Sequence, residues 1–184
     1  HIERIDDDSG TVIVEAGAIL QTVQEACRDA GALLAVDLGA RGSCQVGGNV
    51  STNAGGNRVI RYGNTRDLVL GLEVVLADGT VLSMLNQMVK NNAGMDLKHL
   101  FIGSEGVLGV VTRVVFKLQP LPKGVSTAVV ALQDYPAALR FLRHAQQSLS
   151  GQVSAFEIMW NDYLVTAVEA GKLRAPLDTS YPVY

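Results

Sequence analysis

A glycine-rich stretch of thirty residues, from Asp37 to Arg66, constrains the fold more than any other part of the sequence. Seven of these residues are glycine, and several others are serine, threonine or asparagine. No apolar period of two or 3.6 runs through the stretch. It is therefore predicted to be neither an ordinary core strand nor an ordinary core helix. Glycine allows positive φ and close main-chain approach, at an entropic cost on folding. Exposed amides and short hydroxyls favour a compensating ligand with many acceptor oxygens, such as a phosphate-bearing cofactor.

Two common phosphate-binding motifs are absent from this stretch. Gly42 and Gly47 have P-loop spacing, but Gly48 and Asn49 follow where lysine and serine or threonine are required. The paired glycines also do not fit the GxGxxG fingerprint of dinucleotide-binding folds. Segment 47–56 is instead interpreted as a short helical turn whose amides and hydroxyls face a ligand. Composition alone leaves a solvated glycine-rich loop as the alternative.

Two blocks of the sequence carry a resemblance to a known family: DLGARGSCQVGGNVSTNAGGNRVIRYGNTRD and KNNAGMDLKHLFIGSEGVLGVVT. They resemble the FAD-linked oxidases of the vanillyl-alcohol oxidase and p-cresol methylhydroxylase superfamily. Within it the similarity is greatest to D-2-hydroxyglutarate dehydrogenase and its D-lactate dehydrogenase and glycolate oxidase relatives. The resemblance implies a flavoprotein that oxidises a D-2-hydroxy acid to a 2-oxo acid.

The resemblance also implies which residues line the cofactor. The family places the glycine-rich stretch along FAD and the GSEGxLG segment, here Gly103 to Val111, near its adenosine half. No catalytic or metal-ligating residue is assigned. The implied cofactor-binding residues are Leu38, Gly39, Ser43, Cys44, Gly47, Gly48, Asn49, Thr52, Asn53, Gly55, Gly56, Glu105, Gly106, Gly109, Val110 and Val111.

Two further points concern whether FAD is held covalently and which charged residues contact its pyrophosphate. Some members of the superfamily hold FAD covalently through Cys or His, but the resemblance points to the subfamily with non-covalent, dissociable FAD, in which Cys44 packs as a small side chain. Four arginines of the stretch are either partners of the pyrophosphate or solvated loop charges, and the sequence leaves this open: Arg41, Arg58, Arg61 and Arg66.

Length and composition exclude several classes of protein. A chain of 184 residues suits one domain or slightly more, and 48% hydrophobic with 18% charged residues indicates a folded protein. A net charge of −3 without a basic run gives no support for nucleic-acid binding, and no apolar stretch reaches membrane-span length. Two distant cysteines make neither a disulfide framework nor a zinc site, which fits a reducing compartment: the cytoplasm, or the mitochondrial matrix in a eukaryote. Without an initiator Met or a signal-like segment, the chain is expected to be a fragment or processed piece.

The first two thirds of the chain predict alternating strands and helices. Thr11–Glu15 is expected as a strand, 19–30 as a helix with Cys27 on its apolar face and Gly31 at its C′ position, and 32–36 as a short strand. Residues 68–76 and 81–85 predict a hairpin with a type I′ turn at Asp78-Gly79. Asp96 is expected to cap a short helix. Val110 to Leu118 has strand periodicity, and the free amides and carbonyls of its first residues are expected to read an adenine edge.

A boundary is predicted at Pro120 and Pro122. Beyond it, 127–132 and 153–159 are expected as strands, Asp134 as the cap of a helix with Pro136 in its first turn, and 160–170 as a helix ended by Gly171. This β-α-β-α order predicts the opening of a ferredoxin-like domain. The chain is thus expected to be α+β: residues 1–119 are the second subdomain of a p-cresol-methylhydroxylase-type FAD-binding domain, and 120–184 the start of a substrate-binding cap.

Several parts of the family pattern are absent. The upstream pyrophosphate loop with its Arg-Gly-Gly signature is missing, Met95 stands where the relatives have tyrosine, and the cap histidines, metal carboxylate and substrate arginine are not in view. Oxidation needs a base and a cation for the substrate carboxylate. The chain alone is therefore predicted to be inactive and to bind FAD weakly. The alternative is a non-catalytic flavin-binding or scaffold subunit of a glycolate oxidase-like complex. The electron acceptor is unknown, and a homodimer of the parent protein is compatible with the family.

Overall fold

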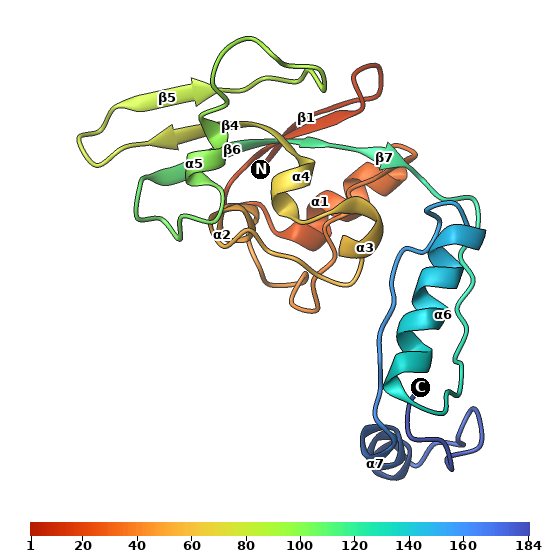
Figure 1. Ribbon diagram of the computed structural model, residues 1–184. Coiled ribbons are helices and arrows are strands. Elements are labelled where there is room, and N and C mark those ends of the chain that lie inside the picture. The colour runs from red at the N-terminus through yellow and green to blue at the C-terminus, as the bar shows by residue number, and fades with distance from the viewer. The chain divides into compact units, whose positions relative to one another are not determined.

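The computed structural model describes residues 1–184, which divide into two compact units, His1–Lys123 and Gly124–Tyr184. We refer to them as the first and the second unit. The first unit combines helices with an antiparallel sheet, as Figure 1 shows, so the mixed helix and sheet content expected from the sequence is confirmed.

The sheet of the first unit has five strands in the order β1-β2-β6-β4-β5, and all neighbouring strands are antiparallel. Two shorter strands, β3 and β7, form a separate pair, so the predicted strand 32–36 is shortened to two residues and Pro120 lies inside a ladder. The strands are β1 Ile2–Asp6, β2 Thr11–Glu15, β3 Ala32–Leu33, β4 Val69–Val75, β5 Val81–Met84, β6 Val110–Lys117 and β7 Gln119–Pro120.

Five helices belong to the first unit: α1 Leu20–Asp29, α2 Val46–Ser51, α3 Val59–Tyr62, α4 Thr65–Leu68 and α5 Lys98–Phe101. α1, α2 and α4 lie on the same side of the sheet (Figure 1). Alternate residues of β2, β4 and β6 pack with α1 and α2 in one core, in which Cys27 is fully buried, as predicted. Gly31 follows α1 with a φ of +81°, which confirms the predicted C′ glycine.

The hairpin between β4 and β5 is confirmed, but its predicted turn type is wrong. Gly79 has a φ of +85°, whereas Asp78 is not in the left-handed region that a type I′ turn requires at both centres. The Gly79 N–H donates to the Leu76 carbonyl at 2.9 Å, and the Leu76 N–H donates to the Thr80 carbonyl at the same distance. The Asp78 carboxylate accepts from the Thr80 N–H at 2.9 Å, so a local side-chain bond favours the wider turn with one left-handed glycine.

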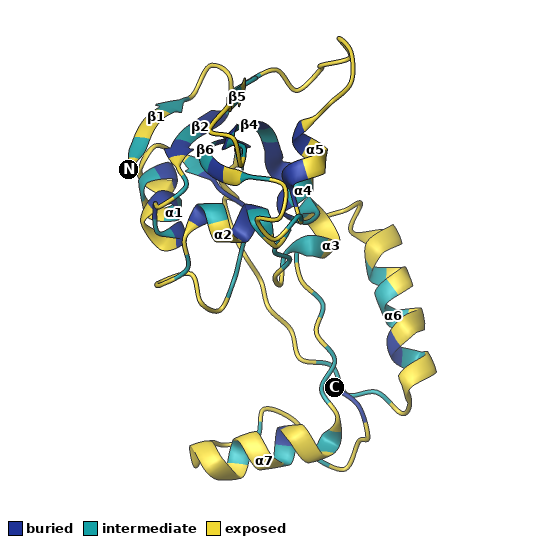
Figure 2. Ribbon diagram, turned by 90° about the vertical axis from the view of Figure 1, so that its left-hand side faces the viewer, coloured by how far each residue is buried: buried dark blue, intermediate teal, exposed yellow.

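The second unit contains α6 Tyr135–Ser148 and α7 Asn161–Gly171. Asp134 caps α6 as predicted, because its carboxylate accepts from the Ala137 N–H at 2.6 Å. α7 includes Gly171, and the left-handed residue that ends it is Lys172, so the predicted stop is one residue early. Most of α6 and α7 is exposed (Figure 2).

The two strands predicted in the second unit, 127–132 and 153–159, are wrong. Only isolated bridges form there, between Val183 and each of Leu132 and Trp160. Met159 and Tyr184 exchange two main-chain hydrogen bonds of 2.8 Å. An alternating segment becomes a strand only when a neighbour pairs along its length, and residues 183–184 offer too short a partner.

Candidate functional site

The two segments singled out by the sequence meet at the C-terminal end of α2. The Gly103 N–H donates to the Val50 carbonyl at 3.1 Å, and the Glu105 N–H donates to the Ser51 carbonyl at 2.8 Å. The last carbonyls of a helix have no partner within it, so the incoming loop satisfies two of them. We call this contact between α2 and residues 103–106 the junction.

The start of α4 holds the turn that follows α2. The Thr65 N–H and hydroxyl both donate to the Ala54 carbonyl, at 3.1 and 2.7 Å, and the Arg66 N–H donates to Asn53 Oδ1 at 2.9 Å. Asp67 Oδ2 accepts from the Asn64 N–H at 2.7 Å and fixes the first turn of α4. Sequence reasoning missed this role of α4, although Asn64 followed three residues later by an acid is a capping signal.

Two non-glycine residues at the junction have left-handed backbones. Asn53 has a φ of 48° and Glu105 a φ of 54°, and they are the only such residues of the first unit. This conformation is unfavourable for a side chain other than glycine by roughly 1–2 kcal/mol, least for asparagine. Such positions gather where the surrounding structure imposes a geometry, often at ligand sites.

The expectation that the amides at the start of α2 are free for a ligand is only partly correct. The Val46 N–H donates to the Ala18 carbonyl at 2.9 Å, and the Gly47 N–H donates to the Ala16 carbonyl at 2.8 Å. These two amides are used within the chain. The Gly48 N–H has no protein partner, and Gly48 is exposed.

Several glycines are required by the fold itself. A Cβ on Gly47 would lie 2.7 Å from the Ala16 Cβ, one on Gly56 would lie 1.9 Å from the Asp37 carbonyl oxygen, and one on Gly109 would lie 2.6 Å from Val74 Cγ1. By contrast, a Cβ on Gly39, Gly48 or Gly106 meets nothing within 4 Å. The glycine-rich composition therefore has two causes, close internal packing and open positions at the surface.

The expected free edge at the start of β6 needs a similar correction. Val110 and Val111 pair with Val75 and Val74 of β4, so one edge of their main chain is used. Their side chains differ as well, because Val110 is 65% exposed and Val111 is buried in the core. On the other edge, β2 ends where Glu15 pairs with Arg113, before these two valines.

All four arginines of the stretch contact other groups of the chain, a question that the sequence left open. Arg41 and Arg58 both pair with Asp37, at 2.9 and 3.2 Å, and the guanidinium of Arg61 lies 5.0 Å from the centre of the Tyr62 ring. Arg66 contacts main-chain carbonyls. Neither cysteine is in a disulfide; Cys44 is half-buried beside the core, and its sulfur lies 3.6 Å from Asn49 Nδ2.

The remaining expected cofactor residues lie near these contacts. Ser43 and Thr52 are exposed, and their hydroxyls donate to the carbonyls of Ala40 and Gly48. Leu38 and Gly55 are half-buried, and Leu38 lies beside Gly56 where residue 37 bridges to the glycine pair. The structure thus brings segment 48–56 together with 103–106, and segment 37–38 together with Gly56.

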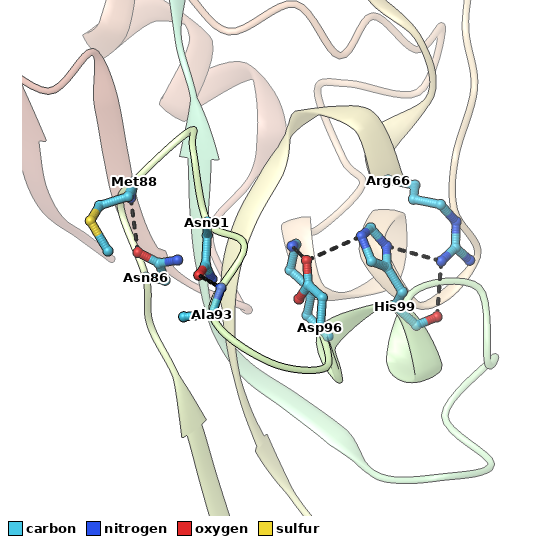
Figure 3. Close-up of polar contacts among 8 residues, drawn as sticks. Arg66, Asn86, Met88, Asn91, Ala93, Asp96 and His99 are labelled. Atoms are coloured by element: carbon cyan, nitrogen blue, oxygen red, sulfur yellow. Dashed lines mark hydrogen bonds and ion pairs between the residues drawn. The ribbon is translucent and has the colours of Figure 1, made fainter.

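A small cavity of about 180 Å³ lies apart from these residues, next to β4 and β5. It is lined by Leu70, Met84, Asn86, Asn91, Ala93, Gly94, Met95, Asp96 and Leu97. The oxygens of Asn86 and Asn91 accept from the N–H groups of Met88 and Ala93, as Figure 3 shows. Met95 is 84% exposed. Asp96 makes no side-chain cap, contrary to the prediction, because its carboxylate pairs with Lys98 and His99.

One protein family matches the glycine-rich part of the chain. Residues 1–85 match the model of a family described as an FAD binding domain. Over these residues the chain is similar to an FAD-binding domain. The match covers the whole glycine-rich stretch together with β1, β2 and β4, and confirms the cofactor expected from the sequence.

Curated relatives confirm the resemblance noted in the sequence. The chain is 49% identical over 157 residues to D-2-hydroxyglutarate dehydrogenase, mitochondrial, of Arabidopsis thaliana, covering 85% of this chain and 28% of that protein. It is 41% identical over 174 residues to D-2-hydroxyglutarate dehydrogenase of Xanthomonas citri pv. viticola, covering 95% and 36%. The chain thus spans about a third of the length of the relatives that it matches.

The fold has solved counterparts. Alkyldihydroxyacetonephosphate synthase superposes with a TM-score of 0.64 at 22% identity, over 81% of this chain and 27% of that one. At this identity the likeness establishes the fold alone. None of the helices combines the length and apolarity that crossing a bilayer requires.

Proposed function

We propose that the chain is the FAD-binding portion of a flavin-dependent dehydrogenase that oxidises a D-2-hydroxy acid, of the D-2-hydroxyglutarate, D-lactate or glycolate type, to the 2-oxo acid. The observation that carries the proposal is the junction. Two segments more than fifty residues apart in the sequence, each expected to contact FAD, are joined by the N–H groups of Gly103 and Glu105. The names of the curated relatives supply the substrate class.

The described residues fit a dinucleotide in a specific way. The exposed glycines 48 and 106 leave room for close approach, and the Gly48 N–H and the Thr52 hydroxyl are polar groups at the surface beside them. A Cβ at Gly47, Gly56 or Gly109 would clash with the chain, and Val111 is buried, so these residues are proposed to reach the ligand through main-chain atoms alone. FAD supplies the redox chemistry when bound, and a main-chain N–H to a charged oxygen contributes about 1.5–3 kcal/mol.

The chemical step is proposed to depend on residues beyond this chain. No acid–base residue is assigned here, so the first unit is proposed to hold the cofactor non-covalently, and the second to begin the substrate-binding cap. We propose that the chain alone is inactive and binds FAD weakly. The parent protein takes a small hydroxy acid and an electron acceptor, is compatible with a homodimer, and works in the cytoplasm or mitochondrial matrix.

The test is to express the complete reading frame that contains this chain and to record its visible absorption. A flavin spectrum that bleaches on addition of D-2-hydroxyglutarate, D-lactate or glycolate supports the proposal and identifies the substrate. A flavin spectrum that no hydroxy acid bleaches favours the alternative, a non-catalytic flavin-binding subunit. Absence of a flavin spectrum from the folded protein refutes both.

A further inference from the structure

Arg66 connects three elements around the junction. Its Nη1 donates to the His99 carbonyl at 2.9 Å, its Nη2 donates to the Ile102 carbonyl, and its main-chain N–H donates to Asn53 Oδ1. The charged head therefore binds the end of α5, while the backbone binds the turn after α2. These contacts lie immediately before Gly103 and Glu105, whose N–H groups close the junction.

The guanidinium provides a C-terminal cap for α5 from outside the helix. α5 has four residues, and the last carbonyls of so short a helix need partners from elsewhere. A planar fork with several N–H donors can reach two carbonyls in different directions, which a lysine ammonium on a flexible stem does less well. No carboxylate lies within ion-pair distance of Arg66, so its contacts are to main chain and to one histidine.

The His99 ring lies between the Arg66 guanidinium and the Asp96 carboxylate (Figure 3). The Arg66 Nη1 lies 3.3 Å from His99 Nδ1, and His99 Nε2 lies 3.4 Å from Asp96 Oδ2. Because arginine can only donate, Nδ1 accepts in this arrangement and the ring proton is on Nε2, facing the carboxylate. Asp96 and Lys98 also pair, which fixes the carboxylate.

We propose that Arg66 is a positioning residue of the cofactor site: it holds the loop that begins at Gly103 against α2, and so sets the distance between the two FAD-binding segments. This inference rests on the proposed function for its ligand. Arg66 itself touches no cofactor in this role. It acts through the carbonyls of residues 99 and 102 and through Asn53.

The experiment uses the complete protein and three variants, Arg66→Ala, Arg66→Lys and Arg41→Ala. Arg41 is the matched control, because it removes the same charge from the same stretch but pairs with Asp37. Hydrogen–deuterium exchange is measured by mass spectrometry for peptides containing Gly103 and Glu105 and for one containing Gly47, whose N–H bonds to Ala16. FAD affinity is measured by titration of flavin fluorescence.

In Arg66→Ala, exchange at residues 103–105 is expected to rise on the order of tenfold or more while the Gly47 peptide is unchanged, and FAD binding weakens by a similar factor. Arg66→Lys restores part of both effects, and Arg41→Ala leaves exchange at 103–105 unchanged. The inference is overturned if 103–105 exchange as in the wild type, or if all peptides accelerate together. If Arg66→Ala does not fold, the same peptide comparison in Arg66→Lys decides. A wild-type protein without FAD affinity refutes the proposed function alone, since the exchange pattern still tests Arg66.

Discussion

The two units of the chain differ in how far their apolar residues are buried. In the first, β2, β6 and β4 lie between the outer strands, and their inward residues are fully buried against α1 and α2. In the second, the buried residues are Ala138, Leu164, Val183 and Tyr184, while Trp160 and Tyr163 are more than half exposed. Both units have regular apolar patterns in their sequences. Only in the first does each patterned strand have a neighbour within the chain.

The difference shows where stability resides. Burial of apolar surface drives folding at about 25 cal/mol per Å², so a unit with a closed core carries most of the free energy of unfolding. The helices of the second unit depend more on local features, such as the cap that Asp134 provides for α6. The two units are therefore expected to unfold in separate transitions.

The largest expected effect is a loss of stability when a buried leucine of the first unit is replaced, compared with an exposed leucine of the second. Leu72→Ala removes a fully buried side chain from β4, and Leu139→Ala removes one that is 47% exposed on α6. Leu72→Ala is expected to destabilise the first unit by about 2–5 kcal/mol, and Leu139→Ala the second by less than about 1. Urea unfolding is followed by circular dichroism of the sheet and by fluorescence of Trp160, the single tryptophan, which reports the second unit. Equal losses for the two variants would contradict the comparison.

The sequence predicted some local features correctly, but not the turn type at Asp78-Gly79 or the side-chain partners of Asp96. The C′ glycine after α1 and the cap of α6 were correct, because each depends on residues within one turn. The strands expected at 127–132 and 153–159 were wrong, since alternation describes a face and not its partner. Segment 47–56 was correctly expected to contain a helical turn, and α2 forms there. The hydrogen bonds from the first N–H groups of α2 to the carbonyls of Ala16 and Ala18 could not be predicted, because they depend on how α2 packs beside the end of β2.

Within the first unit, two adjacent glycines test the two causes of the glycine-rich composition. Gly47→Ala places a methyl group 2.7 Å from the Ala16 Cβ, whereas Gly48→Ala meets no atom within 4 Å. Gly47→Ala is expected to destabilise the first unit by about 1–3 kcal/mol through overpacking. Gly48→Ala is expected to be neutral or stabilising by up to about 1 kcal/mol, because alanine favours a helix.

The same pair separates folding from binding. If the open position at Gly48 serves close approach of FAD, Gly48→Ala weakens FAD binding in the complete protein without loss of stability. Thermal unfolding with and without FAD measures both properties, because a ligand that binds the folded state raises Tm by an amount that grows with the logarithm of its concentration divided by its Kd. A Gly48→Ala variant with unchanged stability and unchanged FAD binding would remove this glycine from the proposed contacts.

Acid provides the smallest and most selective test of the comparison. Arg113 on β6 donates two hydrogen bonds to Glu3 on β1 and lies 3.5 Å from Glu73 on β4, so one guanidinium links three strands of the first unit. The pKa of Glu3 is lowered from its ordinary value of 4.5, chiefly by the hydrogen bond from Arg113.

A carboxylate whose pKa is lower in the folded than in the unfolded state contributes stability above the unfolded pKa, and this stability is lost as pH falls through the folded pKa. The first unit should therefore lose stability below about pH 4.5. In Glu3→Gln this loss should be smaller. The Tm of the variant at pH 7 should be lower by only on the order of 2 °C, because exposed ion pairs contribute little.

The second unit serves as the control, because Glu3 belongs to the first unit. Its own ion pair, Arg140 with Asp134 at 3.9 Å, is exposed on both sides and is unchanged in Glu3→Gln. The Trp160 transition should therefore be the same in Glu3→Gln and wild type at every pH. Parallel Tm curves for the sheet signal of the two proteins would show that Glu3 does not carry the acid sensitivity of the first unit.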